Sequence, residues 1–143
     1  MTEHLYANKG QDGLPVRSKG IFDISVLDGI TRNNPAQRQK LIQMVSSLML
    51  TSLAELAQSH AFWKTGDTAA ALRMLHTLRG AVGNLGAKRF AAATINIENA
   101  AQKEPDEVSA YFETASIELT DTLAIAEIWL KNAASAEQRV PKL

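Results

Sequence analysis

Hydrophobic residues recur every three or four positions along most of the chain, which is the spacing of amphipathic helices. The pattern predicts a short helix over residues 21–31 and longer helices over residues 35–62, 68–85, 88–103 and 106–132. Four amphipathic helices joined by short loops pack most simply as an antiparallel up-down bundle. We therefore expect an all-α fold: a four-helix bundle with a short additional N-terminal helix that covers one end.

Residues with strong positional preferences mark the ends of these helices. Asn34 is placed to cap the helix that starts at Pro35, and Asp67 or Thr68 to cap the next one. Gly86 suits the C-terminal cap of that helix. The apolar stripes then predict buried faces. For the first two helices the expected core positions are Phe22, Val26, Leu27, Ile30, Ile42, Val45, Met49, Leu53 and Leu56.

The two ends of the chain differ from its helical middle. Residues 1–20 are polar, contain three glycines and a proline, and show no sustained period, so we expect a flexible linker or tail there. Residues 133–143 are expected to form a polar C-terminal tail. The folded domain is thus predicted over residues 21–132. The N-terminal segment suits both a linker to an upstream domain and an ordinary frayed terminus.

The composition of the chain indicates its fold class and excludes several kinds of partner and site. The chain of 143 residues is 45% hydrophobic but 6% aromatic, which favours helices over a sheet. Its formal net charge is zero, so no basic field favours nucleic acid. The absence of cysteine excludes disulfides and thiolate metal sites. No apolar run approaches the roughly 20 residues of a membrane span. We expect a soluble, cytoplasmic domain that contacts neither nucleic acid nor membrane.

The third predicted helix carries the most informative chemistry. Its core face on a helical wheel consists of Ala71, Leu75, Leu78, Val82 and Leu85. His76 falls roughly 140° from the centre of that face, which predicts a solvent-facing imidazole. Arg79 and Gly80, at the third and fourth positions after it, are its neighbours on the outer surface.

Glycines on this outer face leave room for a partner. Each glycine within a helix costs about 0.5–1 kcal/mol relative to alanine. Gly80 and Gly83 lie on the side away from the core, so packing inside a bundle does not call for them. Without side chains they leave a smooth patch beside His76 that another protein could approach.

An exposed histidine beside a cation suits phosphoryl transfer. Neutral imidazole is a nucleophile near pH 7, and Arg79 could pair with the oxygens of a phosphoryl group attached to His76. The sequence shows no glycine-rich phosphate loop followed by lysine. The phosphoryl group would therefore come from another protein.

Residues 76–87, H-T-L-R-G-A-V-G-N-L-G-A, resemble the signature of histidine-containing phosphotransfer (HPt) domains of bacterial two-component phosphorelays. That pattern is H-x-L-[K/R]-G followed by small residues and a second glycine near a leucine. The matching residues are His76, Leu78, Arg79, Gly80, Leu85 and Gly86. Glu98, which follows an apolar residue on the next helix, fits the wider pattern. Leu75 departs from it, since a small residue is common there, and this would alter the approach of a partner slightly.

The resemblance implies a mechanism. His76, through Nε2, would accept a phosphoryl group from a receiver-domain aspartyl phosphate and pass it to another receiver aspartate. Arg79 would stabilise the phosphoryl group, and Gly80 would give the partner clearance. The candidate docking residues are Leu72, Thr77, Gly83, Asn84 and Lys88.

The same resemblance implies which partners and cofactors take part. The partners would be response-regulator receivers and a sensor histidine kinase, and the module itself would be a monomer. Mg²⁺ would belong to the receiver, and this chain would bind no cofactor. The module would either stand alone or form the end of a hybrid sensor kinase, and it carries no ATP site of its own in either case.

Other interpretations remain open. A helical adaptor could use the same patch to bind a signalling partner without chemistry. An enzyme using His76 as a general base would need a pocket and a second catalytic group, and the sequence offers neither convincingly. His60, at the end of an apolar stripe, reads as a boundary residue, and His4 lies in the tail. No two histidines have helical metal-site spacing, so no metal site is expected.

Overall fold

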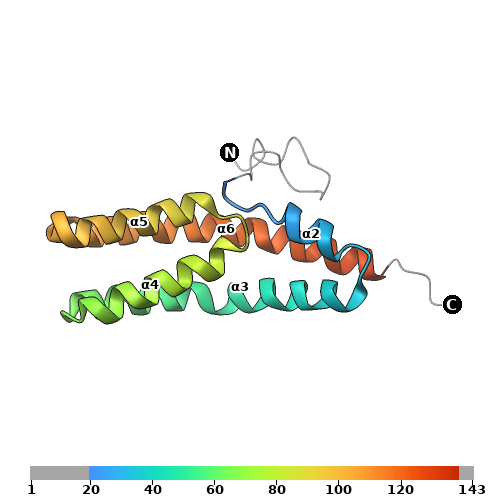
Figure 1. Cartoon of the computed structure of the whole chain (residues 1–143), viewed down its shortest axis with the longest axis horizontal. Coiled ribbons are helices and arrows are strands. Elements are labelled where there is room, and N and C mark those ends of the chain that lie inside the picture. The colour runs from blue at the N-terminus through green and yellow to red at the C-terminus, as the bar shows by residue number, and fades with distance from the viewer. Residues whose placement is uncertain (1–19, 139–143) are drawn as a thin grey trace.

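The computed structural model describes residues 20–138, and within that range every regular element is a helix. In chain order these are α2 (Ser25–Thr31), α3 (Pro35–Lys64), α4 (Thr68–Gly83), α5 (Lys88–Lys103), the 3₁₀ turn η2 (Pro105–Glu107) and α6 (Val108–Gln138). Helices α3 to α6 run alternately up and down and pack side by side (Figure 1). The predicted all-α four-helix bundle with a short N-terminal helix is confirmed. No helix in this part of the chain has the length and apolarity needed to cross a membrane.

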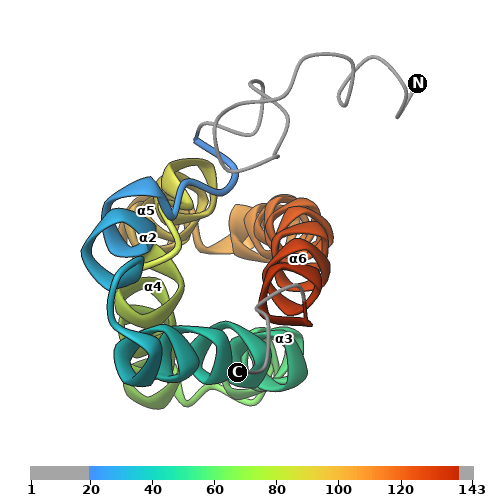
Figure 2. The ribbon, with the colours of Figure 1, turned by 90° about the vertical axis from the view of Figure 1, so that its right-hand side faces the viewer.

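The four helices differ in length, and this divides the bundle into two halves. Helices α3 and α6 have 30 and 31 residues, or about 45 Å, whereas α4 and α5 have 16 residues each, or about 24 Å. The short pair therefore covers one half of the long pair. Helix α2 and residues 20–24 cover the other half (Figures 1 and 2).

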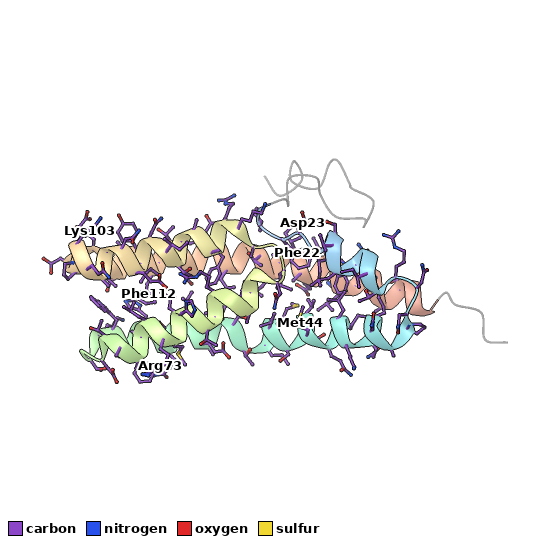
Figure 3. The ribbon with its side chains drawn as sticks, viewed as in Figure 1. Phe22, Asp23, Met44, Arg73, Lys103 and Phe112 are labelled. Atoms are coloured by element: carbon purple, nitrogen blue, oxygen red, sulfur yellow. The ribbon has the colours of Figure 1, made fainter. Side chains whose placement is uncertain are left out.

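Each half has its own apolar core. In the four-helix half the buried side chains include Leu56, Leu75, Leu78, Val82, Phe90, Ile97, Phe112 and Leu119. In the other half they include Ile21, Phe22, Ile24, Leu41, Val45, Leu85, Ile125 and Trp129. Figure 3 shows Phe112 between the helices of the first half and Phe22 near the junction of the two. Helix α4 contributes to the first core, and Leu85 of the loop after it contributes to the second, so the end of α4 lies between the two cores.

The short N-terminal helix starts later than predicted and turns a different face inward. It begins at Ser25, whose backbone N–H and hydroxyl both donate to Asp23 Oδ1, at 3.1 and 2.7 Å. Val26 and Ile30 are 73% and 65% exposed, so the prediction that they are buried was wrong. The apolar contacts come instead from residues 21–24, which precede the helix.

A buried ion pair replaces the expected apolar face of α2. Asp28 is buried and pairs with Arg38 of α3 and, at 3.5 Å, with Arg32. The guanidinium of Arg38 also lies 5.2 Å from the ring centroid of Trp129 on α6. This polar contact joins α2, α3 and α6. The spacing of apolar residues along the sequence does not predict it.

The buried residues of helix α3 also differ from those that its apolar stripe predicts. Leu53 is 41% exposed and Ile42 and Met49 are half-buried, while Ser52 and Ser59 have no exposed surface. The hydroxyl of Ser59 donates to the Ala71 carbonyl of α4 at 2.7 Å. Serine at this position is small enough for the two helices to approach closely, and the bond satisfies its polar group.

Helices α3 and α4 begin at the predicted caps, whereas α6 extends beyond its predicted end. The side chain of Asn34 accepts from Gln37 N–H and that of Asp67 from Ala70 N–H, each at 3.1 Å. Helix α6 continues to Gln138, beyond the predicted end near residue 132. Ala133 is buried in the second core, which explains why the helix continues there. The tail predicted for residues 1–20 lies outside the described residues except for Gly20.

The surroundings of the His60 side chain predict that the stability of the domain depends on pH. Its ring stacks on Phe112 at 4.5 Å, and its Nε2 lies 2.9 Å from Ser109 Oγ. Burial lowers the pKa of His60, with Lys64 adding to the effect and Glu113 opposing it. Because the folded state binds this proton less readily than the unfolded state does, the free energy of unfolding should fall as pH drops below about 6.5. Urea unfolding between pH 8 and 5 tests this. A His60→Gln variant should lose that part of the slope, and an unchanged slope would contradict the assignment.

Candidate functional site

Helix α4 presents one polar, glycine-bearing surface to solvent. Leu75, Leu78 and Val82 are buried on its inner face, and His76 is exposed on the outer face, as the wheel predicts. Leu75 has no exposed surface, so the departure from the family pattern at this position does not reach the surface that a partner would meet.

Arg79 joins His76 to the neighbouring helix. Its Nη2 lies 2.8 Å from His76 Nδ1, and its Nη1 donates to Glu98 Oε1 of α5 at 2.7 Å. The side chains of Arg79 and Glu98 are 20% and 30% exposed, so the ion pair is partly shielded from water. One ring nitrogen of His76 is therefore engaged by Arg79. The structure gives no bond within the described residues for Nε2.

The glycines beside His76 border open space. A Cβ added at Gly80 or at Gly83 would meet, apart from the backbone of its own helix turn, no described atom within 4 Å. Both residues are exposed. Neither glycine is required by packing inside the bundle, as the sequence predicts, so the bare patch is available to a partner.

A scan against protein-family models matches the Hpt domain over residues 40–129, well over half of the chain. The chain belongs to the Hpt domain family. Hpt domains carry out histidine phosphotransfer in phosphorelays and interact there with receiver domains and kinases. Comparisons with curated proteins and with solved structures give no match. The matched range runs from α3 into α6 of this Hpt domain and includes the whole of α4 and α5.

The other predicted docking residues fall into two groups. Thr77, Asn84 and Lys88 are exposed, on α4, the loop after it and the start of α5. Leu72 is half-buried and packs against the first core, so much of its side chain serves the interior of the Hpt domain. The geometry places Thr77, Gly80, Gly83 and Asn84 along one exposed side of α4 and its end.

The sequence alone assigns Glu98 no role in the site. The residue fits the family pattern, but its ion pair with Arg79 depends on how α4 and α5 pack. Arg79 lies about 80° from the centre of the core face of α4, at the side of the helix where a neighbour can reach it. That position was the available signal for a partner on the next helix.

Gly86 belongs to the loop that follows the site helix. Helix α4 ends at Gly83, two residues earlier than predicted, so Gly86 is not its immediate cap. Its φ of +67° is the left-handed conformation that glycine adopts readily. The neighbouring Leu85 carbonyl accepts from Asp23 N–H at 2.6 Å. Residues 20–24 thus pack directly on the α4–α5 loop.

A separate shallow groove lies between α3 and α6. It has a volume of about 280 Å³ and is lined by residues that include Leu53, His60, Phe112 and Glu113. His76 does not line it, so this groove offers no pocket for His76 acting as a general base. Among the described residues no group of three or more carboxylates and histidines is arranged to hold a metal ion.

Proposed function

We propose that this Hpt domain is a phosphorelay intermediate that carries the phosphoryl group on Nε2 of His76. The observation that supports this most directly is the pairing of the exposed ring with Arg79 through Nδ1, at 2.8 Å. With Nδ1 engaged, Nε2 is the nitrogen free to meet a phosphoryl group. An aspartyl phosphate on a receiver domain would be the donor and the aspartate of another receiver the acceptor.

The transfer step exchanges one bond to phosphorus for another. Nε2 forms a bond to the phosphorus atom, the bond from phosphorus to the receiver carboxylate breaks, and the carboxylate leaves with the electron pair. Because Nδ1 accepts from Arg79, the neutral ring carries its hydrogen on Nε2, and this proton passes to solvent as the N–P bond forms. We assign Mg²⁺ to the receiver and no cofactor to this chain, whose contribution is an oriented nucleophile with a cation beside it.

The partner would dock over the exposed side of α4. Thr77, Gly83, Asn84 and Lys88 are exposed residues of α4, the loop after it and the start of α5, and Arg79 contacts the imidazole ring at Nδ1. The partners we propose are receiver domains and a sensor histidine kinase, in the cytoplasm, with the Hpt domain acting as a monomer. The chain is then a carrier between proteins, and it is part of a kinase if it belongs to a hybrid sensor.

Gly80→Ala should raise the stability of the domain and at the same time slow phosphotransfer. Alanine is the better helix former and its Cβ meets open space, so the free energy of unfolding should rise by about 0.5–1 kcal/mol. The added methyl group lies where the receiver approaches, so transfer should slow roughly tenfold, as a misfit of about 1–2 kcal/mol implies.

The matched control for that substitution is Gly29→Ala, in the exposed face of α2, where a Cβ also meets nothing within 4 Å. It should change stability by a similar amount and leave transfer unchanged. Equal transfer rates for both alanine variants would contradict a docking surface at Gly80.

The decisive experiment for the proposed function is phosphotransfer in solution. The chain is incubated with a phosphorylated receiver domain and Mg²⁺, and its phosphate is followed by acid and base treatment. Acid-labile, base-stable phosphate on the chain supports the carrier role. A chain that binds the receiver stably but takes up no phosphate from any of several receivers would favour the adaptor instead.

A further inference from the structure

The contact between Arg79 and His76 fixes which ring nitrogen carries a proton. An arginine guanidinium has N–H donors and no acceptor, and it keeps its proton at all ordinary pH values. At 2.8 Å from Arg79 Nη2, His76 Nδ1 must therefore be the acceptor and offer its lone pair. The neutral ring then carries its hydrogen on Nε2.

This resting state has the hydrogen-bond pattern of the phosphorylated product. In a ring phosphorylated on Nε2, phosphorus occupies the position that hydrogen has at rest, and Nδ1 again has a free lone pair. The same bond from Arg79 fits both states. Protonation of Nδ1 would break this hydrogen bond in either state, because the N–H groups of Arg79 and of Nδ1 would then be two donors facing each other.

Glu98 holds Arg79 in the position where this bond forms. Arginine has a long side chain with many rotamers, and ordering it has an entropic cost. The 2.7 Å bond from Nη1 to Glu98 Oε1 fixes the guanidinium from the α5 side, in a partly shielded location where a charge-assisted bond is stronger than in open water. Glu98 therefore acts on His76 through Arg79.

We propose that Glu98 is a positioning residue for phosphotransfer: by holding Arg79 on Nδ1, it keeps that nitrogen unprotonated and prolongs the life of the phosphohistidine. This inference rests on the proposed function. It assigns to Arg79 a contact with the ring nitrogen opposite the phosphoryl group, in addition to any contact with phosphoryl oxygens.

The chemistry of the leaving group gives the direction of the effect. When the N–P bond breaks, the ring takes the electron pair, and water or a receiver carboxylate forms the new bond to phosphorus. A ring protonated on Nδ1 leaves as neutral imidazole, whereas an unprotonated ring must leave as an anion. Holding Nδ1 unprotonated therefore slows loss of the phosphoryl group to water.

The first test reads the ring directly in the unphosphorylated protein. In ¹⁵N spectra of the imidazole at pH 8, the native chain should show an unprotonated Nδ1 and a protonated Nε2. In Glu98→Ala and in Arg79→Ala the two nitrogen shifts should move toward each other as the tautomers mix. Glu118→Ala is the matched control, because it breaks the 2.8 Å pair with Arg89 away from His76 and should leave the spectrum unchanged.

The second test measures the lifetime of the phosphorylated ring. Each protein is phosphorylated with phosphoramidate, a small donor that needs no receiver, and the decay of phosphohistidine is followed at pH 7. Decay should be about two- to tenfold faster in Glu98→Ala than in the native chain, the range expected for loss of one hydrogen bond. The Arg79→Ala and double variants should match Glu98→Ala, since the two residues act as one unit.

The outcomes separate this inference from the proposed function. The positioning role of Glu98 would be overturned if the native ring carried its proton on Nδ1. It would also be overturned if the Glu98→Ala variant kept the native tautomer and the native decay rate. Either result would stand even if receivers phosphorylated His76 normally. Conversely, the tautomer can be as inferred while receivers fail to transfer phosphate. That result would count against the relay and leave the Glu98–Arg79–His76 arrangement established.

Discussion

Replacing His76 with glutamine should abolish phosphate uptake from a receiver while leaving the fold intact. The glutamine amide nitrogen has no nucleophilic lone pair, so no N–P bond can form. Loss of a nucleophile lowers the rate by more than about a thousandfold. Because His76 is exposed on the outer face of α4, the free energy of unfolding should change by no more than about 0.5 kcal/mol. Transfer from a radiolabelled receiver phosphate, together with a urea unfolding curve, measures both quantities.

The matched control is His60→Gln. His60 is half-buried on α3, stacks on Phe112 and bonds to Ser109, so its replacement should lower stability and leave uptake unchanged. If the His76→Gln protein still gained acid-labile phosphate, the acceptor would be a different residue. If both variants lost uptake equally, the loss at His76 would not identify the site.

The outward direction of His76 could be predicted from sequence because it depends on one helix. Leu75, Leu78 and Val82 set the inner face of α4, and the helical period then fixes the angle of every other residue. The bundle itself followed from four such stripes with short connections. The caps at Asn34 and Asp67 are local as well, since each bonds to an amide three residues away.

Features that depend on pairs of distant elements could not be predicted in this way. The exposure of Val26 and Ile30 results from Asp28 on α2 meeting Arg38 on α3, and neither helix alone reveals it. A hydrophobic period also favours Leu53 over Ser52, yet Ser52 is the buried residue, and its hydroxyl donates to the Leu48 carbonyl of its own helix. The bond from Arg79 to Glu98 spans 19 positions in sequence, so its existence required the packing of α4 on α5.

Gly86→Ala should produce the largest loss of stability among the substitutions considered. A Cβ at this position would lie 2.8 Å from the Asp23 carbonyl carbon and closer still to its oxygen, where no side-chain atom can be accommodated without movement of the backbone. The φ of +67° adds strain of about 1–2 kcal/mol for a residue other than glycine. With overpacking of about 1–3 kcal/mol, we expect the free energy of unfolding to fall by about 2–5 kcal/mol.

Gly66→Ala measures the conformational part of that loss. The difference between the two variants then gives the part that comes from close contact. Gly66 has a φ of +88°, and a Cβ there would meet nothing within 4 Å, so only the conformational strain of about 1–2 kcal/mol applies. The excess loss at Gly86 then measures the cost of forcing a Cβ against residues 20–24. Equal losses in urea unfolding at both glycines would show that residues 20–24 do not approach Gly86 closely. A larger loss at Gly86, with phosphate uptake retained by the folded protein, would make the second glycine of the family pattern a structural residue, in contrast to Gly80 beside the histidine.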